Sequence, residues 1–419
     1  MKISARFRSE VFWNVLSLGV LAVSGLVINF IIAKFYGASV LGVFNQVLAV
    51  FIIFSQFASG GFFFSVLNFV SGCPSDHKKV SAIINSALVS TLLVSIPVAI
   101  ILFYLSGTIG NILDSPGVAT GIRLTSFGLV PFSINKVFMA SLNGLRYMKA
   151  YSFFQSLRYI FIMTALLILT FNKFEGQYLA ASFSAAEVLM MLGIVCFFLF
   201  KYKILKSFSV DLMKEHFRFG IKAMPGGLLM DVNTRVDVLL LGYFMNDAVT
   251  GVYSFAAMIA EGMYQLGIVL AANFNPKISE LLNNKEEFKI RHIISRSNLY
   301  LIPFNLAAGA VIYFLFPFLV DILIGKSDMD MGVYVFGILM LGIAISAGYT
   351  PFQMILNQAG KPGLFTTFLL LTVITNILLN IILIPHLGII GSAVATGSTY
   401  VCTIFFLKFL VKRSLNFSI

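Results

Sequence analysis

Long apolar runs dominate this sequence, and the first of them extends from Val11 to Ala33. A helix that crosses a bilayer needs about 20 apolar residues. The chain of 419 residues is 59% hydrophobic and 11% charged, whereas a soluble domain averages about 45–50% apolar and about 25% charged residues. The sequence therefore predicts an all-α polytopic membrane protein and excludes an ordinary soluble enzyme, a secreted disulfide scaffold and a disordered chain.

Apolar runs separated by short polar or Gly/Pro-containing connections predict twelve transmembrane helices. Their predicted ranges are 11–33, 42–70, 80–106, 121–143, 150–172, 178–200, 217–243, 249–274, 293–320, 331–356, 363–385 and 389–411. A span and its connection take about 30–35 residues, so twelve of them use nearly the whole chain. No stretch remains for a soluble catalytic domain.

Basic residues gather in the connections on one side of the predicted bundle. This side contains Lys2, Arg6, Arg8, Lys78, Lys79, Arg146, Lys149, Lys201, Lys203, Lys206, Lys214, Arg218, Lys277, Lys285, Lys289, Arg291, Arg296, Lys361, Lys408, Lys412 and Arg413. The opposite connections contain only Lys34, Lys173 and Lys326. Because cytoplasmic loops are enriched in Lys and Arg, both termini are predicted to be cytoplasmic. Most of the net charge of +12 thus reflects topology.

An internal repeat predicts two lobes. Residues 35–44 align with residues 244–253 at an offset of 209. Because six predicted helices, an even number, separate the two copies, both copies have the same orientation, as in a parallel repeat with a pseudo-two-fold axis along the membrane normal. We therefore predict an N-terminal six-helix lobe over 1–200, a cytoplasmic linker over 201–216 and a C-terminal six-helix lobe over 217–419.

Several stretches of the chain resemble a known family. Gly37–Gln46 is similar to the early signature of polysaccharide exporters in the MATE-like (MOP) superfamily. Asn357–Pro362, Asn376–Asn380 and Ile384–Thr396 closely resemble the eleventh and twelfth helices of these exporters. Within the superfamily, the chain looks most like the Wzx-type O-antigen flippases, which move lipid-linked oligosaccharides.

This resemblance implies two lobes around a central cavity, with alternating access between the two membrane faces. It also implies a substrate, the undecaprenyl-pyrophosphate-linked oligosaccharide repeat unit used in O-antigen and lipopolysaccharide biosynthesis. The unit is moved across the bacterial cytoplasmic (inner) membrane, with a proton or sodium ion as the coupling cation. Membrane lipid and other polysaccharide assembly proteins are implied partners, whereas nucleic acid is not expected.

Five basic residues fall inside the predicted spans. Burial of an ionisable side chain there costs free energy, so such a side chain normally faces a water-filled cavity or an oppositely charged or polar partner. They are Arg123, Lys136, Arg158, Lys222 and Arg235. Lys136 lies about 20 Å along its predicted helix, beyond snorkelling reach. It either lines a cavity or pairs with an acid such as Glu187. Arg123 can instead snorkel at the periplasmic end, and Lys222 fits an interface anchor.

We assign the cations and carboxylates at membrane depth to two roles. A cavity for the pyrophosphate and sugar is predicted from Arg123, Lys136, Arg158 and Arg235, because the arginine fork donates two hydrogen bonds to phosphate oxygens. Coupling to a cation is predicted from Asp231, Asp237 and Glu261. Asp231 and Arg235 are four residues apart, so on one helix they can instead neutralise each other.

Several motifs are absent from the sequence. It has no GxxxxGK[ST], HExxH or GxSxG motif, and Cys73, Cys196 and Cys402 form no CxxC pair. We therefore expect a transporter without catalytic residues, metal or cofactor. Two alternatives stay open. A cation-coupled drug or metabolite antiporter of the same fold is disfavoured by the buried cations, and a membrane-embedded polysaccharide polymerase or ligase by the short periplasmic connections.

Overall fold

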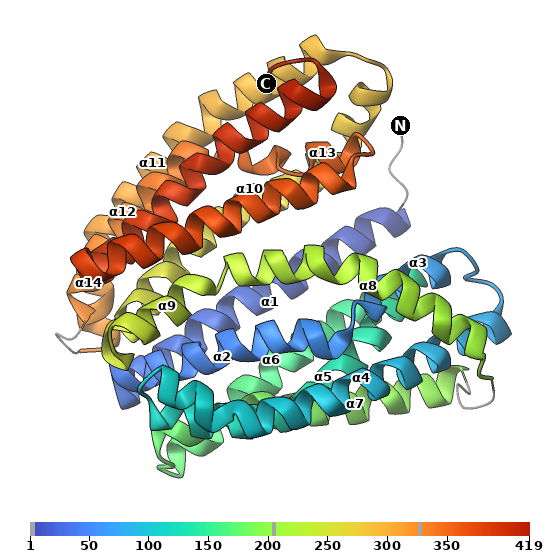
Figure 1. Ribbon diagram of the computed structural model, residues 1–419, viewed down its shortest axis with the longest axis horizontal. Helices are drawn as coiled ribbons and strands as arrows, with labels where there is room; N and C mark the ends of the chain where they lie inside the picture. The colour runs from blue at the N-terminus through green and yellow to red at the C-terminus, as the bar shows by residue number, and fades with distance from the viewer. Residues whose placement is uncertain (1–4, 203–206, 326–328) are drawn as a thin grey trace. The chain divides into compact units, whose positions relative to one another are not determined.

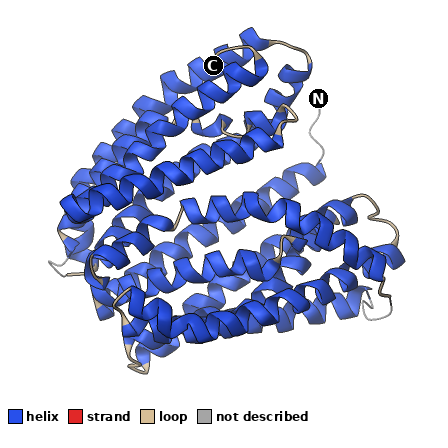
Figure 2. Cartoon of the chain, in the orientation of Figure 1, coloured by secondary structure: helices blue, strands red, loops and turns tan. Residues whose placement is uncertain are grey.

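The computed structural model describes residues 5–202, 207–325 and 329–419. Within these ranges the chain forms helices and connecting turns, with no strand (Figure 2). Nine of the described helices are long and apolar enough to cross a membrane, or ten if one bent pair counts as a span. The all-α membrane class is confirmed, whereas the number twelve stays a prediction. Four lysines of the predicted topology lie outside the described residues: Lys2, Lys203, Lys206 and Lys326.

The chain divides into two compact units. The first consists of residues 1–35 and 43–231, and the second of residues 36–42 and 232–419. The predicted lobes place their boundary earlier, at the linker 201–216, of which residues 203–206 lie outside the described part of the chain.

The first unit is built around one central helix. α5 contacts α3, α4, α6 and α7, and apolar side chains such as Ile83, Leu142, Met190 and Phe198 fill the core between them. The helices that lie wholly or mainly in this unit are α1 (Ala5–Tyr36), α2 (Ala38–Ser59), α3 (Phe62–Ser71), α4 (His77–Ile112), α5 (Pro116–Gly144), α6 (Met148–Phe171), α7 (Ala181–Tyr202) and α8 (Val210–Asn233), as Figure 1 shows. A 3-10 turn, η1 (Gly176–Tyr178), precedes α7.

The predicted span 42–70 is broken into α2 and α3. Gly60 and Gly61 separate the two helices with φ angles of +53° and +69°. These left-handed values cost glycine nothing, whereas they strain residues with a Cβ atom. Gly60 and Gly61 therefore end α2 and let a new helix, α3, begin inside the predicted span.

The second half of the predicted linker 201–216 is helical: it forms the start of α8, which begins at Val210. His216 is fully buried. Its Nε2 atom lies 3.1 Å from the carbonyl oxygen of Ile83, and its Nδ1 atom lies 2.6 Å from Ser65 Oγ. These contacts fix the start of α8 against α3 and α4.

The second unit contains the remaining helices, of which α10, α11, α12 and α14 are long and pack against one another (Figure 1). They are α9 (Val236–Phe244), α10 (Asp247–Asn283), α11 (Glu287–Leu323), α12 (Met331–Ser346), α13 (Ile355–Gln358) and α14 (Pro362–Leu415). A 3-10 turn, η4 (Thr350–Phe352), leads from α12 towards α13, and the chain bends by 56° there. α14 is kinked at Gly388, whose φ and ψ are 56° and −133°, so its two arms correspond to the spans predicted at 363–385 and 389–411.

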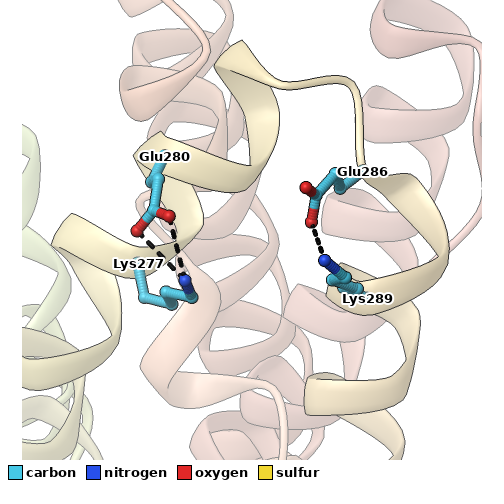
Figure 3. Close-up of polar contacts among 4 residues, drawn as sticks. All are labelled: Lys277, Glu280, Glu286 and Lys289. Atoms are coloured by element: carbon cyan, nitrogen blue, oxygen red, sulfur yellow. Dashed lines mark hydrogen bonds and ion pairs between the residues drawn. The ribbon is translucent and has the colours of Figure 1, made fainter.

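The predicted connection at 275–292 is much shorter in the structure. α10 continues to Asn283 and α11 begins at Glu287. Two ion pairs lie at these helix ends (Figure 3): Lys277 Nζ to Glu280 Oε2 at 3.0 Å and Lys289 Nζ to Glu286 Oε2 at 2.6 Å. Both are i,i+3 pairs, which support a helix in water. The predicted spans are defined by apolar runs, and these runs end where the chain leaves the bilayer. They therefore do not predict that α10 and α11 continue beyond the spans.

Inside the second unit, two helix starts meet at glycines. A Cβ atom on Gly42 would lie 1.8 Å from the carbonyl oxygen of Asp247, and a Cβ atom on Gly251 would lie 1.9 Å from that of Ala38. The offset of 209 matches Gly42 with Gly251 and Ala38 with Asp247. This reciprocal contact is the kind that two-fold symmetry produces, so it is consistent with the predicted repeat.

Candidate functional site

Three helices of the first unit bring together charged side chains that fall inside predicted spans. Arg158 Nε on α6 lies 2.8 Å from Glu187 Oε1 on α7. Asn135 on α5 donates from Nδ2 to Glu187 Oε2 at 2.8 Å and to the Glu187 carbonyl oxygen at 2.9 Å. The Glu187 side chain is only 4% exposed. We call Lys136, Arg158, Glu187 and Asn135 the charged cluster.

Lys136 faces aromatic rings in this cluster. Its Nζ atom lies 4.7 Å from the centroid of Phe63 and 5.0 Å from that of Phe132. Arg158 Cζ lies 5.1 Å from the centroid of the same Phe132 ring, so two cations contact one aromatic ring. The acid that the sequence proposes for Lys136 is paired with Arg158 instead. Among the described residues, the Lys136 ammonium makes no hydrogen bond or ion pair.

Asp231 adds a second carboxylate near the charged cluster. It lies on α8 within the first unit, accepts a hydrogen bond from Gln56 Nε2 and acts electrostatically on Lys136. The proposed i,i+4 contact with Arg235 is wrong in its premise. α8 ends at Asn233, and Arg235 is the N-cap residue of α9, so the two residues do not share a helix.

The other two predicted cations of the first unit lie apart from the charged cluster. Arg123 is exposed on α5, with its Cζ atom 5.6 Å from the Phe103 ring. This position suits snorkelling. Lys222 is exposed on α8. The structure therefore brings together Lys136 and Arg158 but not Arg123.

Removal of the Arg158 side chain gives a first prediction. Arg158→Ala leaves Glu187 buried without its cation, and breaking a buried pair in this way costs about 3–5 kcal/mol. We expect Arg158→Ala to unfold at a clearly lower temperature than the wild type in detergent. The double variant Arg158→Leu/Glu187→Leu should recover most of that loss, because it removes both charges. Equal melting temperatures for wild type and Arg158→Ala would contradict the pairing.

Asp237 is the centre of a second polar group, in the second unit. It is 5% exposed, although it lies on α9 among apolar residues. Tyr253 donates from its hydroxyl to Asp237 Oδ2 at 2.6 Å, and Thr396 Oγ1 lies 3.4 Å from the same oxygen. The backbone amide of Val238 donates to Asp237 Oδ1 at 2.9 Å. Helices α9, α10 and α14 thus meet at one carboxylate.

Neutral oxygens extend this group along α14. Asn380 donates from Nδ2 to the side-chain oxygen of Asn376 at 2.6 Å, and Ser392 Oγ donates to Asn380 Oδ1 at 2.8 Å. Asn376 in turn donates to the carbonyl oxygen of Asn233 at 3.3 Å. All three side chains on α14 are buried. We call Asp237, Tyr253, Asn376, Asn380, Ser392 and Thr396 the oxygen cluster.

Glu261 and Arg235 are the other two predicted site residues of the second unit. Arg235 acts electrostatically on both Glu261 and Asp237, and Glu261 acts on Tyr400. The ring of Tyr400 lies 5.0 Å from that of Tyr264. The predicted cation-coupling set is therefore divided: Asp237 and Glu261 share the second unit, whereas Asp231 belongs to the first. Arg235, predicted to contact substrate, lies with the carboxylates.

The sequence reasoning missed the neutral members of both clusters because it searched for charge. Asn135 precedes Lys136, and Gln56 falls in an apolar run. Asn376 and Asn380 are four residues apart in a long apolar helix. Amide side chains repeated on one face of such a helix are the signal that could have identified them.

Comparisons with known proteins agree with this architecture. Residues 75–331 match a family model described as "Polysaccharide biosynthesis protein". The "Probable low-salt glycan biosynthesis flippase Agl15" of Haloferax volcanii is 25% identical over 167 residues, which cover 39% of this chain and 35% of that relative. The match thus spans about a third of the relative's length.

Solved structures show the fold. The lipid II flippase MurJ in an inward closed conformation matches with a TM-score of 0.77 at 16% identity, covering 96% of this chain and 87% of that one. An inward-facing multidrug resistance MATE family transporter of the MOP superfamily matches with a TM-score of 0.75 at 14% identity, covering 93% and 95%. The resemblance seen in the sequence is confirmed: this multi-pass membrane protein has the MurJ/MATE fold and belongs to the polysaccharide biosynthesis protein family.

Proposed function

We propose that the protein is a lipid flippase that translocates undecaprenyl-pyrophosphate-linked oligosaccharide repeat units of O-antigen type. It moves them from the cytoplasmic to the periplasmic leaflet of the bacterial cytoplasmic membrane by alternating access. The observation that carries this proposal is the presence of Lys136 and Arg158 around Phe132 at membrane depth, in a chain of the polysaccharide biosynthesis family. Two adjacent cations suit a diphosphate, which has several acceptor oxygens and more than one negative charge.

The charged cluster has donors left for a phosphate. Glu187 holds Arg158 through Nε, while Arg158 Nη2 is buried without a hydrogen-bond partner in the described part of the chain. Lys136 carries three ammonium donors, and none is used within the described residues. A diphosphate that reaches the cluster therefore meets an oriented guanidinium and an ammonium without having to break the Arg158–Glu187 pair.

The proposed direction of transport rests on charge distribution. Basic connections mark the cytoplasmic side, so both termini are proposed to face the cytoplasm. The lipid-linked saccharide is proposed to move away from that side, from the cytoplasmic to the periplasmic leaflet.

The oxygen cluster is proposed to bind the coupling cation. A carboxylate, hydroxyls and amide oxygens are the ligands that hard cations prefer, and Asp237, Thr396 and Asn380 supply one of each kind. Glu261 is a second candidate for this role, because it lies in the same unit. A sodium ion or a proton fits the site by this chemistry.

Loss of the Asp237 charge tests this assignment. Asp237→Asn keeps the shape of the side chain but removes the negative charge that a cation would neutralise. We expect transport by Asp237→Asn to lose its dependence on an imposed sodium or proton gradient, measured in vesicles. The matched control Glu280→Gln alters an exposed carboxylate of the same unit and should behave like the wild type. Full gradient dependence in Asp237→Asn would refute the assignment.

Complementation separates the proposed function from its alternatives. The chain would be expressed in a strain that lacks its O-antigen flippase, and surface polysaccharide would be scored. A flippase restores surface polysaccharide. A drug antiporter of the same fold would instead raise drug resistance without restoring polysaccharide, and its cationic substrates would be repelled by Lys136 and Arg158. A polymerase or ligase would change chain length or attachment only where a flippase is present.

A further inference from the structure

A cavity of about 680 Å³ opens in the first unit, formed by α1, α6 and α7. Its walls are mostly apolar, and the side chains that form them include Leu16, Val20, Phe153, Phe154 and Phe197. None of Lys136, Arg158 and Glu187 lines it. The charged cluster is therefore not part of the wall of this cavity.

Two lysines are the only charged residues in the described wall of this cavity. Lys149 Nζ lies 5.4 Å from the centroid of Trp13, and Lys201 Nζ lies 3.7 Å from that of Tyr147. Lys149 is at the start of α6 and Lys201 at the end of α7. Because these helices follow one another through a short connection, both ammonium groups lie at the same end. No carboxylate in the described wall neutralises them, so the cavity offers positive charge to a ligand.

Hydroxyl groups follow the lysines along α6. Ser152 and Ser156 line the cavity and are three and seven residues after Lys149, on the same helix face. Ser152 is 2% exposed, and its Oγ has no hydrogen-bond partner among the described residues. At about 1.5 Å per residue, Ser152 lies about 4.5 Å deeper than Lys149. Ser152 and Ser156 thus place two hydroxyl groups deeper along α6 than Lys149, in a wall that is otherwise mostly apolar.

We propose that this cavity binds an anionic glycerophospholipid of the surrounding membrane. Its phosphate lies between Lys149 and Lys201, its ester group lies at the level of Ser152, and an acyl chain fills the apolar part between α1 and α6. Basic pockets between helices at a membrane surface bind lipid headgroups in this manner. The lipid joins α1 to α6 and α7 and is not the transported substrate, so this inference does not rest on the transport function.

The test measures lipid binding to the purified full chain in detergent. Native mass spectrometry would count bound dioleoyl phosphatidylglycerol and, separately, dioleoyl phosphatidylcholine. We expect the wild type to bind phosphatidylglycerol about 10-fold more tightly than does Lys149→Gln/Lys201→Gln, since two cations near the headgroup are lost. Lys277→Gln/Lys289→Gln removes two exposed lysines of the second unit and should bind like the wild type.

Two further variants test the proposal if Lys149→Gln/Lys201→Gln folds poorly. Lys149→Arg/Lys201→Arg preserves both charges and should retain the lipid. Leu16→Trp places a larger side chain in the cavity and should reduce binding with both lysines present. Equal binding of the two phospholipids by the wild type, or full binding by Leu16→Trp, would overturn the proposal. Displacement of phosphatidylglycerol by a lower concentration of undecaprenyl phosphate would also overturn it, in favour of the carrier lipid.

Discussion

Replacement of Lys136 by alanine is expected to lower transport of lipid-linked saccharide about 10-fold or more while the amount of folded protein in the membrane stays unchanged. The Lys136 ammonium faces the Phe63 and Phe132 rings and makes no ion pair among the described residues. Its removal therefore does not break an ion pair with a buried carboxylate. A hydrogen bond to a charged group contributes about 1.5–3 kcal/mol. Its loss therefore corresponds to at least a 10-fold effect on binding of the phosphate.

The matched control is Lys222→Ala, which removes an exposed lysine from the same unit. It should transport within about 2-fold of the wild type, as is usual for a surface substitution. Lys136→Arg keeps the charge and should retain part of the activity, because arginine is larger and its donors form a rigid fork. Full transport by Lys136→Ala, at normal protein levels, would show that the charged cluster does not bind substrate.

Gly251→Leu is expected to prevent accumulation of folded protein. A Cβ atom at this position would lie 1.9 Å from the carbonyl oxygen of Ala38 and 2.9 Å from the amide nitrogen of Gly42. Backbone atoms cannot move aside as a flexible side chain can, so the helix starts must separate. Overpacking typically costs about 1–3 kcal/mol and more where the backbone is involved. Even Gly251→Ala should lower the melting temperature, measured by size-exclusion chromatography of heated samples.

Gly262→Ala provides the control for this substitution. Gly262 lies on α10 like Gly251, but nothing lies within 4 Å of an added Cβ atom. Because alanine favours a helix over glycine by about 1 kcal/mol, Gly262→Ala should melt at the wild-type temperature or slightly above it. A Gly251→Ala protein as stable as Gly262→Ala would contradict the close helix contact.

The predicted spans follow the helices closely because the length of an apolar run matches the thickness of the bilayer that the helix must cross. Each of the twelve ranges coincides with a described helix, a helix pair or one arm of α14. Hydrophobicity does not predict where a helix continues beyond the membrane into water. It also does not predict a break in a helix where the residues on both sides are apolar. α10 continues to Asn283 beyond the predicted end at 274, and α2 gives way to α3 at Gly60 and Gly61 inside the predicted span 42–70.

The candidate site could be predicted only in part, since sequence spacing gives partners on one helix but not between helices. The structure places Lys136 and Arg158 in one unit, and the partner of Glu187 is Arg158, from a different helix, rather than Lys136. The break after Asn233 separates Asp231 from Arg235. Tyr253 and Thr396 contact Asp237 from helices that are far apart in the chain. The spacing of residues within one helix does not predict such a contact.

Direct measurement of lipid translocation tests the central claim. The purified protein would be reconstituted into vesicles with a fluorescent undecaprenyl-pyrophosphate-linked oligosaccharide, and the fraction accessible to a membrane-impermeant quencher would be followed over time. We predict that wild-type vesicles move the labelled lipid between leaflets, whereas vesicles with Lys136→Ala resemble protein-free vesicles. Wild-type vesicles that translocate the lipid no faster than protein-free vesicles, under sodium and proton gradients of either direction, would contradict the account.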